Sequence, residues 1–340
     1  MAGLYTKGYV RKLTRRFGIT PIKFGWRPSI YRKKAVIRVR TDTGAFALKP
    51  FYRSTSFPSG TVEQMKTTAK HAEWLTSSGY SYMPRWLYAD SGKLWIVSKG
   101  RPFYMTEWIT GRGLEGAGDF ANLGRAIATL HHTSSELLQS QESDSFTRKQ
   151  LGLWKLQERR LLHDKVGALR NAKLRRWFRK YGEDCRSLSE RSWAEMNDPE
   201  IAALLDQEST RPALIHGDIT STNVMISDDD RLYILDWDRV KIGSIYIELA
   251  KTLANTAQFN PEFLQSLLNG YEEIRPLTRT ERRLIAALFR FPREAWTVAC
   301  FPKRKSNSAL IDILDGSWGV RLNAVGFLDA WANPVEESGE

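Results

Sequence analysis

The chain of 340 residues is 42% hydrophobic and 26% charged, as expected for a globular protein with a sizeable core, and its apolar runs are too short to cross a bilayer. Its two cysteines, Cys185 and Cys300, exclude a disulfide framework and a cysteine metal cluster, and the basic N-terminus lacks the apolar core of a signal peptide, so we expect a cytoplasmic protein. The net charge of +13 is common among nucleic-acid-binding proteins, but no zinc-finger, RNP or basic-zipper motif is present, so no specific nucleic acid is expected as a partner.

Short alternating patterns predict a small β-rich lobe in the first third of the chain. Residues 35 to 51 alternate apolar and polar side chains around the turn Thr41-Asp42-Thr43-Gly44, which predicts a β-hairpin. A capped helix is expected over residues 59 to 77. Residues 93–97 and 102–109 then predict two more strands.

A dense run of glycines follows these strands, at positions 111, 113, 116 and 118. Such a run is typical of a linker, and its context is not that of a dinucleotide or phosphate-binding fingerprint. We therefore expect an N-lobe of residues 1–109 and a C-lobe of residues 110–340, joined by a hinge near residues 105–118. After Asp119 the pattern becomes helical, except for an insert at 213–238. Helices are expected at 119–134, 148–181, 199–207, 245–258, 260–272, 278–299 and 318–332, with Gly152 and Gly167 as points at which the second of these can divide into shorter pieces.

The insert contains the segment LIHGDITSTNVMISDDDRLYILDWD, in which an acid and an amide lie on a loop between two apolar, strand-like runs. The spacing of Asp218 and Asn223 equals that of the acid and amide in a protein-kinase catalytic loop, with Gly217 in place of the arginine. Asp236 ends the next apolar run. Phosphoryl transfer from a Mg-nucleotide needs an acid that accepts the hydroxyl proton, and an amide and a second acid that hold the metal. The pattern predicts Asp218 in the first role, and Asn223 with Asp236 as Mg²⁺ ligands.

Single members of this set also have simpler interpretations. Asp and Asn are common in loops because their side chains bond the local backbone, and residues 228–230 are expected to form a solvated turn. His216 is expected to be a buried, hydrogen-bonded support, since no second His or Cys lies at ligand spacing. Gly217 would permit a bend of the backbone.

The HGD-x-x-x-x-N loop and the LDWD sequence resemble the aminoglycoside phosphotransferase and choline kinase superfamily, and within it the CotS-type spore-coat proteins. The likeness extends over roughly residues 20 to 330. It includes the segments 44–49, 108–111 and 123–131, and, for the CotS branch in particular, 248–251 and 291–292. The resemblance implies an α+β, protein-kinase-like two-lobed fold with a small β-rich N-lobe and a larger, mostly helical C-lobe. It also implies ATP and Mg²⁺ as cofactors, and a location in the cytoplasm or the spore coat.

Lys49 ends a predicted strand, where a lysine is usually just exposed. The resemblance implies instead that its ammonium binds the α- and β-phosphates and pairs with a helix carboxylate. We expect Glu63 to be that carboxylate, with Glu73 as the alternative, although the helix dipole alone also favours an acid at position 63. The chain departs from the family at two places. It has no clear glycine-rich phosphate loop, residues 24–28 being the nearest candidate, and Glu248 replaces an Asp that in the family braces the catalytic loop.

The stretch from Arg148 to Lys180 holds twelve lysines and arginines against two acids, Glu158 and Asp164. Its apolar residues recur at steps of three and four, which predicts amphipathic helices whose basic residues form either a solvated face or an anion-facing surface. The expected function is phosphoryl transfer from the nucleotide to a hydroxyl of a neutral or anionic small molecule or coat component, with spore-coat proteins as partners. The alternative is a non-catalytic spore-coat scaffold that retains the fold.

Overall fold

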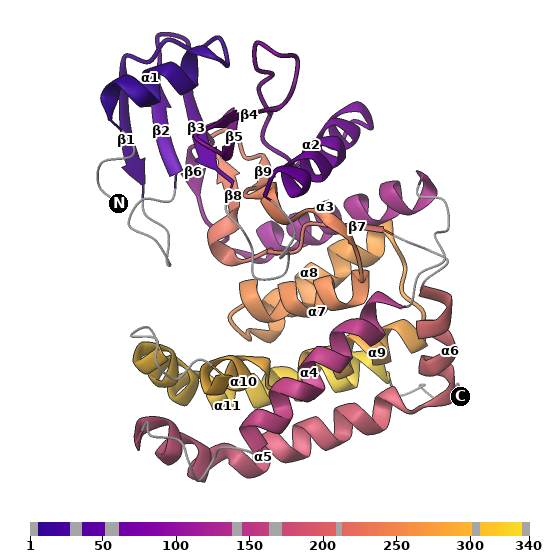
Figure 1. Ribbon diagram of the computed structural model, residues 1–340. Helices are drawn as coiled ribbons and strands as arrows, with labels where there is room; N and C mark the ends of the chain where they lie inside the picture. Colours follow the sequence, from indigo (N-terminus) through magenta and orange to yellow (C-terminus); the bar gives the residue numbers. More distant parts are fainter. Residues whose placement is uncertain are drawn as a thin grey trace. The chain divides into compact units, whose positions relative to one another are not determined.

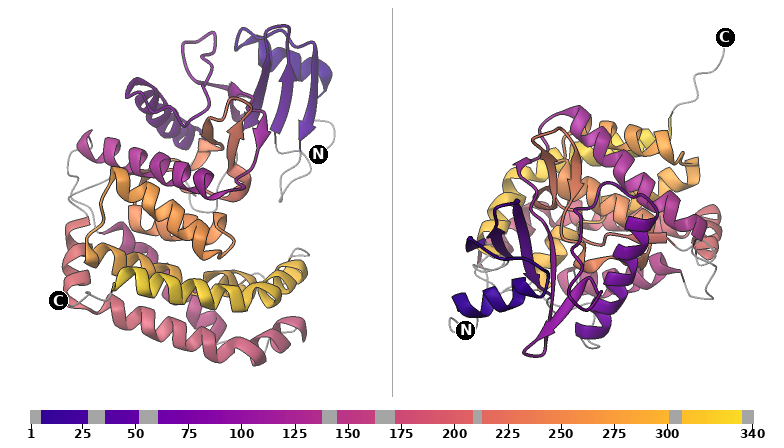
Figure 2. Two further views of the ribbon diagram at one scale, coloured as in Figure 1. Left: turned by 180° about the vertical axis from the view of Figure 1, so that it is seen from behind. Right: turned by 90° about the horizontal axis from the view of Figure 1, so that it is seen from above.

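The computed structural model describes residues 6–27, 36–51, 61–137, 145–162, 172–208, 213–300 and 307–334. The chain forms two compact units (Figures 1 and 2). The first unit comprises residues 1–114, 216–218 and 222–241, and the second comprises residues 115–215, 219–221 and 242–340. Most of the predicted insert therefore belongs to the first unit, while the division into lobes of 1–109 and 110–340 stays a prediction. Among the described helices, none is both long and apolar enough to span a membrane.

The first unit is built on a five-stranded antiparallel sheet in the order β1-β2-β3-β5-β4. Its strands are β1 (Lys23–Arg27), β2 (Val36–Arg40), β3 (Ala45–Pro50), β4 (Trp95–Ser98) and β5 (Arg101–Glu107), and its helices are α1 (Lys7–Arg15) and α2 (Thr61–Ser77). The predicted hairpin is confirmed, since Arg40 on β2 pairs with Ala45 on β3. Strand β3 alternates, with Phe46 and Leu48 buried in the core and Lys49 on the opposite face of the sheet.

Helix α1 was not expected from the sequence. The hydroxyl of Thr6 caps it by accepting a hydrogen bond from the Tyr9 amide at 3.3 Å. Its apolar side chains, Val10 and Leu13, are buried in the same core cluster as Ile37 and Val39 of the sheet. The basic N-terminal segment is therefore an amphipathic helix that covers one face of the sheet.

A second, three-stranded sheet carries the end of the predicted insert. Its strands are β6 (Gly111–Arg112), β8 (Val224–Ser227) and β9 (Leu232–Ile234), in the order β6-β8-β9. The start of the glycine run is thus a strand rather than only a linker. The turn at residues 228–230 is exposed, and Asp230 has a positive φ of 57°, as predicted for a solvated hairpin tip.

The second unit is mostly helical. Its helices are α3 (Ala117–Leu137), α4 (Phe146–Leu162), α5 (Ala172–Met196), α6 (Pro199–Glu208), α7 (Ile245–Thr256), α8 (Pro261–Ile274), α9 (Arg279–Arg290), α10 (Arg293–Cys300) and α11 (Asn307–Ala332). The short strands β7 (Ala213–Ile215) and β10 (Lys241–Gly243) pair with each other. Helices α5, α9 and α11 lie side by side (Figures 1 and 2).

The expected helix boundaries differ from the structure at three places. The segment 148–181 is divided into α4 and α5, as its glycines allowed, but α5 continues to Met196; Gly152 lies inside α4, and Gly167 lies among residues 163–171, outside the described residues. The segment 278–299 is broken between α9 and α10 at Pro292, which lacks an amide N–H and holds Phe291 in an extended conformation with ψ of 128°. Helix α11 begins at Asn307 rather than at 318.

Helices α3 and α8 approach each other closely because both present a glycine at the contact. A Cβ atom on Gly270 would lie 2.0 Å from the Ala121 carbonyl oxygen, and one on Gly124 would lie 2.1 Å from the Leu267 carbonyl oxygen. The backbones of the two helices therefore touch directly, and neither position has room for a side chain.

We expect Gly270→Ala to lower the free energy of unfolding by about 1–3 kcal/mol, because the added methyl group would force the two helices apart. Gly319→Ala on α11 is the matched control, since nothing lies within 4 Å of its Cβ position. Alanine there should be neutral or stabilise the helix by up to about 1 kcal/mol. Urea unfolding of both variants measures the difference, and equal stability would contradict the close packing of α3 on α8.

Candidate active site

His216 anchors the start of the predicted catalytic loop from a fully buried position. The amide N–H of Asp218 donates to its Nδ1 at 3.3 Å, so the other nitrogen, Nε2, carries the proton and donates to the Leu235 carbonyl at 2.9 Å. The ring thereby ties the loop to the end of β9. The structure confirms the predicted supporting role.

Gly217 has a φ of +82°, and a Cβ atom on it would lie 2.9 Å from the Arg239 carbonyl oxygen. Both the conformation and the close approach require glycine at this position. The contact brings the loop against the chain that follows β9. There the Arg239 guanidinium lies 3.4 Å from the Asp218 carboxylate.

Asn223 is positioned by two hydrogen bonds. Its side-chain amide donates to the Asp218 carbonyl at 2.9 Å, and its own carbonyl accepts from the Leu235 amide at 2.7 Å. The second bond extends the pairing of β8 with β9 by one residue. Because this bond places Asn223 opposite Leu235, the residue just before Asp236, the two predicted metal ligands lie next to each other on the paired strands.

Asp236 adopts the left-handed conformation, with a φ of 68°. This conformation is uncommon for a residue other than glycine, although aspartate adopts it more readily than most, as Asp230 does at the exposed turn. The next residue, Trp237, is buried and fixes the turn. Its indole N–H donates to the Ile234 carbonyl at 2.6 Å, and its ring meets the His216 ring edge-on at 4.7 Å between centroids.

The Lys49 ammonium lies between two carboxylates. It is hydrogen-bonded to Asp236, and it lies 3.2 Å from the Asp238 carboxylate. Burial alone would lower the pKa of Lys49, but the surrounding Tyr104, Asp238 and Asp236 outweigh burial and hold this pKa well above its ordinary value. Lys49 is therefore charged at neutral pH.

Asp238 is a member of this cluster to which the sequence pattern assigned no role. Burial is the largest cause that raises its pKa to about 7, and the neighbouring charge of Asp236 acts in the same direction. The signal in the sequence was the second acid of LDWD. Two carboxylates and the Asn223 amide oxygen are the hard oxygen ligands that Mg²⁺ prefers, so the residues present fit this metal.

Two predicted features of the nucleotide site differ from the structure. Glu63 is exposed, and its carboxylate pairs with Lys66 on the same helix at 2.6 Å. Glu63 does not form an ion pair with Lys49, because the Lys49 ammonium contacts Asp236 and Asp238 instead. A role for Glu63 or Glu73 with bound nucleotide stays a prediction. Residues 24–27 of the candidate phosphate loop belong to strand β1, and residue 28 lies outside the described residues.

Glu248 lies in the second unit, within a buried hydrogen-bonded chain. Its carboxylate lies 3.0 Å from Nε2 of His131, whose Nδ1 lies 2.9 Å from the Tyr271 hydroxyl. Burial lowers the pKa of His131, so the ring is neutral and passes a hydrogen bond from the tyrosine to the carboxylate. On the same helix as Glu248, the Asn255 side chain donates to the Ile219 carbonyl at 3.4 Å and so supports the loop residue after Asp218.

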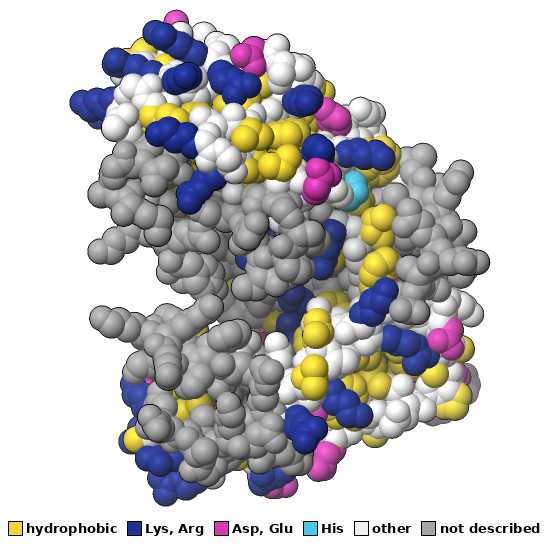
Figure 3. Space-filling model, viewed as in Figure 1, with side chains coloured by type: hydrophobic (Ala, Val, Ile, Leu, Met, Phe, Trp, Pro, Cys, Tyr) yellow, Lys and Arg dark blue, Asp and Glu magenta, His cyan; other side chains and the backbone are white. Residues whose placement is uncertain are grey.

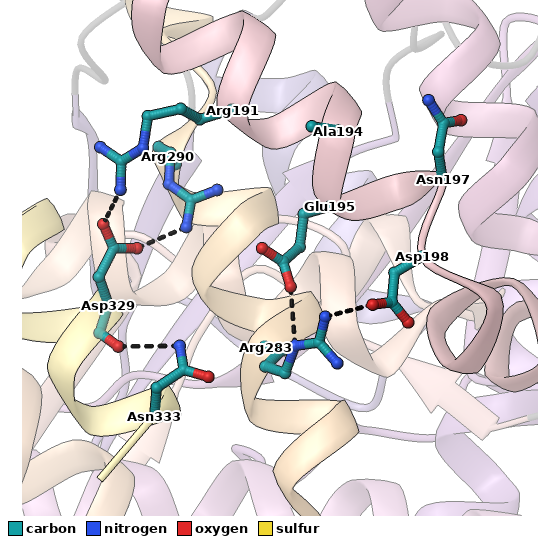
Figure 4. A pocket seen from close by; sticks show the side chains of 9 residues that line it. All are labelled: Arg191, Ala194, Glu195, Asn197, Asp198, Arg283, Arg290, Asp329 and Asn333. Atoms are coloured by element: carbon teal, nitrogen blue, oxygen red, sulfur yellow. Dashed lines mark hydrogen bonds and ion pairs between the residues drawn. The ribbon is translucent and has the colours of Figure 1, made fainter. Parts of the chain in front are cut away.

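A separate hollow of about 530 Å³ lies in the second unit and contains none of the predicted site residues (Figure 4). Its guanidinium groups are paired. Arg283 contacts Glu195 and Asp198 at 2.8 and 2.6 Å, while Arg191 and Arg290 both contact Asp329 at 2.5 Å. These ion pairs link α5, α9 and α11, which indicates a structural role.

The chain matches the model of one protein family, described as the phosphotransferase enzyme family, over residues 20–285. This match confirms two expectations from the sequence. These are the superfamily and the enzyme class, a phosphotransferase that acts on hydroxyl groups.

Solved structures of low sequence identity share the fold. An aminoglycoside phosphotransferase from Alicyclobacillus acidocaldarius superimposes with a TM-score of 0.80 at 13% identity, covering 98% of each chain. A spectinomycin phosphotransferase bound to ADP and spectinomycin has a TM-score of 0.64 at 16% identity, covering 96% of this chain and 98% of that chain. A microcompartment-associated aminopropanol kinase has a TM-score of 0.62 at 18% identity, covering 95% and 99%. These likenesses confirm the predicted kinase-like α+β fold class.

The raised pKa of Asp238 predicts a pH dependence of stability. Native Asp238 holds its proton more tightly than the unfolded chain, so its contribution to the free energy of unfolding falls as the pH rises from its ordinary value of 3.8 toward about 7. In metal-free buffer, Asp238→Asn should therefore gain stability relative to the wild type as the pH rises through this range. Asp228→Asn, at the exposed turn, is the control for the replacement of a carboxylate by an amide. The measurement is the melting temperature of each protein across this pH range. Parallel curves of melting temperature against pH for the wild type and Asp238→Asn would contradict the prediction.

Proposed function

The chain belongs to the phosphotransferase enzyme family, and from that premise we propose that it transfers the γ-phosphoryl group of ATP to a hydroxyl of a neutral or anionic acceptor. The observation that carries this proposal is the convergence of Asp218, Asn223 and Asp236 around one hairpin, with the Lys49 ammonium beside them. A loop that only needed turn-forming residues would not require a charged lysine from a distant strand.

In the proposed reaction, Asp218 accepts the proton of the acceptor hydroxyl. The acceptor oxygen forms a bond to the γ-phosphorus, the bond from that phosphorus to the bridging oxygen breaks, and ADP leaves with the electron pair. Asp218 must first separate from Arg239, and the 3.4 Å ion pair between partly exposed groups is weak enough to permit this. The freed guanidinium then lies near the charge that develops on the transferred group.

Lys49 is proposed to bind the nucleotide phosphates, and Asn223 and Asp236 to hold Mg²⁺. Asp238 supplies a second carboxylate at the same place. The metal, when bound, would neutralise negative charge on the phosphates. The contribution of the chain itself is to hold the reacting groups in position. The hydrogen bonds of His216 and Asn223 fix the catalytic loop against the turn of Asp236 before any ligand arrives.

The CotS branch is proposed from the resemblance of residues 248–251 and 291–292, which implies a link to the spore coat. A coat scaffold without activity would need no intact site. The charged Lys49, held between two carboxylates, favours the enzyme, because a scaffold gains nothing from charges brought together away from water at this place.

The charge of the acceptor is proposed from α4 and α5. Some of their basic side chains are neutralised in space: Arg148 pairs with Asp206, Lys173 with Asp312 and Lys180 with Asp315. Arg175, Arg176 and Arg179 on α5 are exposed, and no carboxylate partner is found for them in the described part of the chain. This remaining positive charge disfavours a polycationic acceptor.

Mg-ATP should raise the melting temperature of the wild-type protein. At about a hundred times its dissociation constant, the nucleotide should stabilise the native state by about 2.7 kcal/mol. Asp236→Ala should abolish the Mg²⁺-dependent part of this stabilisation, because it removes a charged metal ligand. Asp218→Ala should keep it while losing turnover, since its role is in the transfer step. A fully active Asp218→Ala variant, or no thermal shift in folded wild type, would refute the assignments.

In a screen of acceptors with ATP consumption as the readout, we expect phosphorylation of sugars, polyols or acidic coat proteins and none of aminoglycosides. The physical reason is the repulsion between a polycation and the exposed arginines of α5 for which the described chain provides no carboxylate partner, a repulsion that physiological salt screens over roughly 8 Å. Asp218→Ala serves as the blank. Robust activity on kanamycin-like compounds alone would overturn this choice of acceptor.

A further inference from the structure

The net charge of the chain is concentrated at its N-terminal end. Residues 1–51 contain thirteen lysines and arginines and a single acid, Asp42, so they hold +12 of the total charge of +13. The other 289 residues are almost neutral. Ten of the thirteen cations lie in described residues, on α1, at the residue that caps its C-terminus and on the first three strands. The function proposed above uses one of them, Lys49.

Helix α1 presents four of these cations on its solvent side. Lys7, Arg11, Lys12 and Arg15 are exposed, whereas Val10 and Leu13 on the opposite side are buried. The helix contains no acid. Its dipole favours cations in the last turn, but not Lys7 in the first.

This arrangement costs stability. Cations four residues apart face each other at positions 7 and 11, 11 and 15, and 12 and 16. Each such pair of like charges destabilises a helix by about 0.2–0.5 kcal/mol. A chain that needed α1 only to cover its sheet would gain by placing acids at these positions.

A groove of about 580 Å³ runs along this helix, and the residues Gly8, Arg11, Lys12, Arg15, Arg16 and Asp90 line it. Its one acid, Asp90, faces Arg16 at 3.7 Å, and Arg16 also donates to the Val97 carbonyl at 3.1 Å. For Arg11, Lys12 and Arg15, the described part of the chain provides no carboxylate partner. Figure 3 shows Lys and Arg side chains gathered over the part of the first unit that contains α1.

The groove is separate from the candidate active site. Helix α1 packs on the sheet face to which Phe46 and Leu48 point, and Lys49 lies on the other face. The thickness of the sheet and its core therefore stands between the α1 cations and the residues proposed to bind nucleotide.

We infer that the exposed face of α1, with its groove, binds the phosphodiester backbone of nucleic acid without regard to sequence. Charge complementarity carries this inference, since interfaces with nucleic acid are more polar and more positively charged than those between proteins. A protein partner would need an apolar centre with few charges, and the solvent side of α1 offers only cations and glycine. A membrane surface would need apolar side chains for insertion, and those of α1 are buried in the core.

The spacing of the cations suits a repeating anion. Lys7, Arg11 and Arg15 rise by about 6 Å per step along the helix, which gives a row of about 12 Å. Contacts of this kind position a protein on a phosphate backbone and carry no base specificity. The absence of a base-reading motif from the sequence is consistent with such binding.

The test is fluorescence anisotropy with a labelled oligonucleotide of roughly 20 nucleotides, single-stranded and as a duplex, between about 50 and 200 mM salt. The test variant is Arg11→Glu/Lys12→Glu/Arg15→Glu. The matched control, Arg175→Glu/Arg176→Glu/Arg179→Glu, makes the same change of net charge on exposed positions of α5.

We expect the wild type to bind both forms, with affinity that falls steeply as salt rises. The α1 variant should lose at least about tenfold in affinity, and its salt slope for the single strand should decrease by about 2, because three phosphate contacts are lost. The α5 control should stay within about twofold of wild type. No binding by the wild type, or an equal loss in the control, would overturn the inference. Binding to anionic phospholipid vesicles is measured for the same proteins. An α1 variant that no longer binds these vesicles but binds the oligonucleotide as well as the wild type does would also overturn the inference.

Two measurements separate this site from misfolding and from the nucleotide site. The melting temperature of the α1 variant should not fall below that of the wild type, and its Mg-ATP thermal shift should equal that of the wild type; Arg11→Gln/Lys12→Gln/Arg15→Gln replaces it if the glutamates lower stability. Excess Mg-ATP should not displace the bound oligonucleotide, and full displacement would contradict a separate site. Because the sites lie on opposite faces of the sheet, loss of oligonucleotide binding leaves the proposed phosphotransferase activity untouched.

Discussion

The Lys49 ammonium is the charge on which the candidate active site depends. Two carboxylates held close together away from bulk water repel each other and lose hydration, so Asp236 and Asp238 need a cation between them. That cation comes from β3, and the acids follow β9, so one electrostatic contact joins two parts of the first unit that are remote in sequence. The same balance makes the site responsive to ligands. A nucleotide brings negative charge toward the lysine, and a divalent metal gives the carboxylates an alternative partner.

Those parts of the site that depend on local pattern were predictable from the sequence. The spacing of Asp218 and Asn223, the supporting role of His216 and the hairpin of β8 and β9 follow from short-range rules about loops, turns and strands. The partner of Lys49 did not follow. Glu63 is suitable by its place in a helix, but an ion pair is decided by tertiary position, and there Asp236 and Asp238 lie nearer than any residue that sequence proximity suggests. The sequence shows an aspartate at position 238, but it does not show that this carboxylate is buried beside Lys49.

Two further differences have identifiable physical causes. The break at Pro292 could have been predicted from the missing amide and the restriction on Phe291, but the strong apolar periodicity on both sides favoured one continuous helix. The sequence-based interpretation of the net charge was drawn from residues 148–180, the most basic stretch predicted to be helical. In three dimensions several of those cations are neutralised by acids from α6 and α11, whereas the cations of α1 are not neutralised within the described chain. Counts along the sequence do not reveal which charges meet.

The first unit is assembled from three separated stretches of chain, and this has a consequence for synthesis on the ribosome. Lys49 and Asp236 are 187 positions apart. At translation rates of 5–20 residues per second, roughly 10–40 s pass between the emergence of the lysine and that of its carboxylate partners. During that interval the five-stranded sheet can form, but its Lys49 face has no counter-charge from the loop. Until the hairpin of β8 and β9 has left the exit tunnel, Lys49 therefore adds its charge, without a carboxylate partner, to a nascent segment that is already strongly basic and lies close to ribosomal RNA.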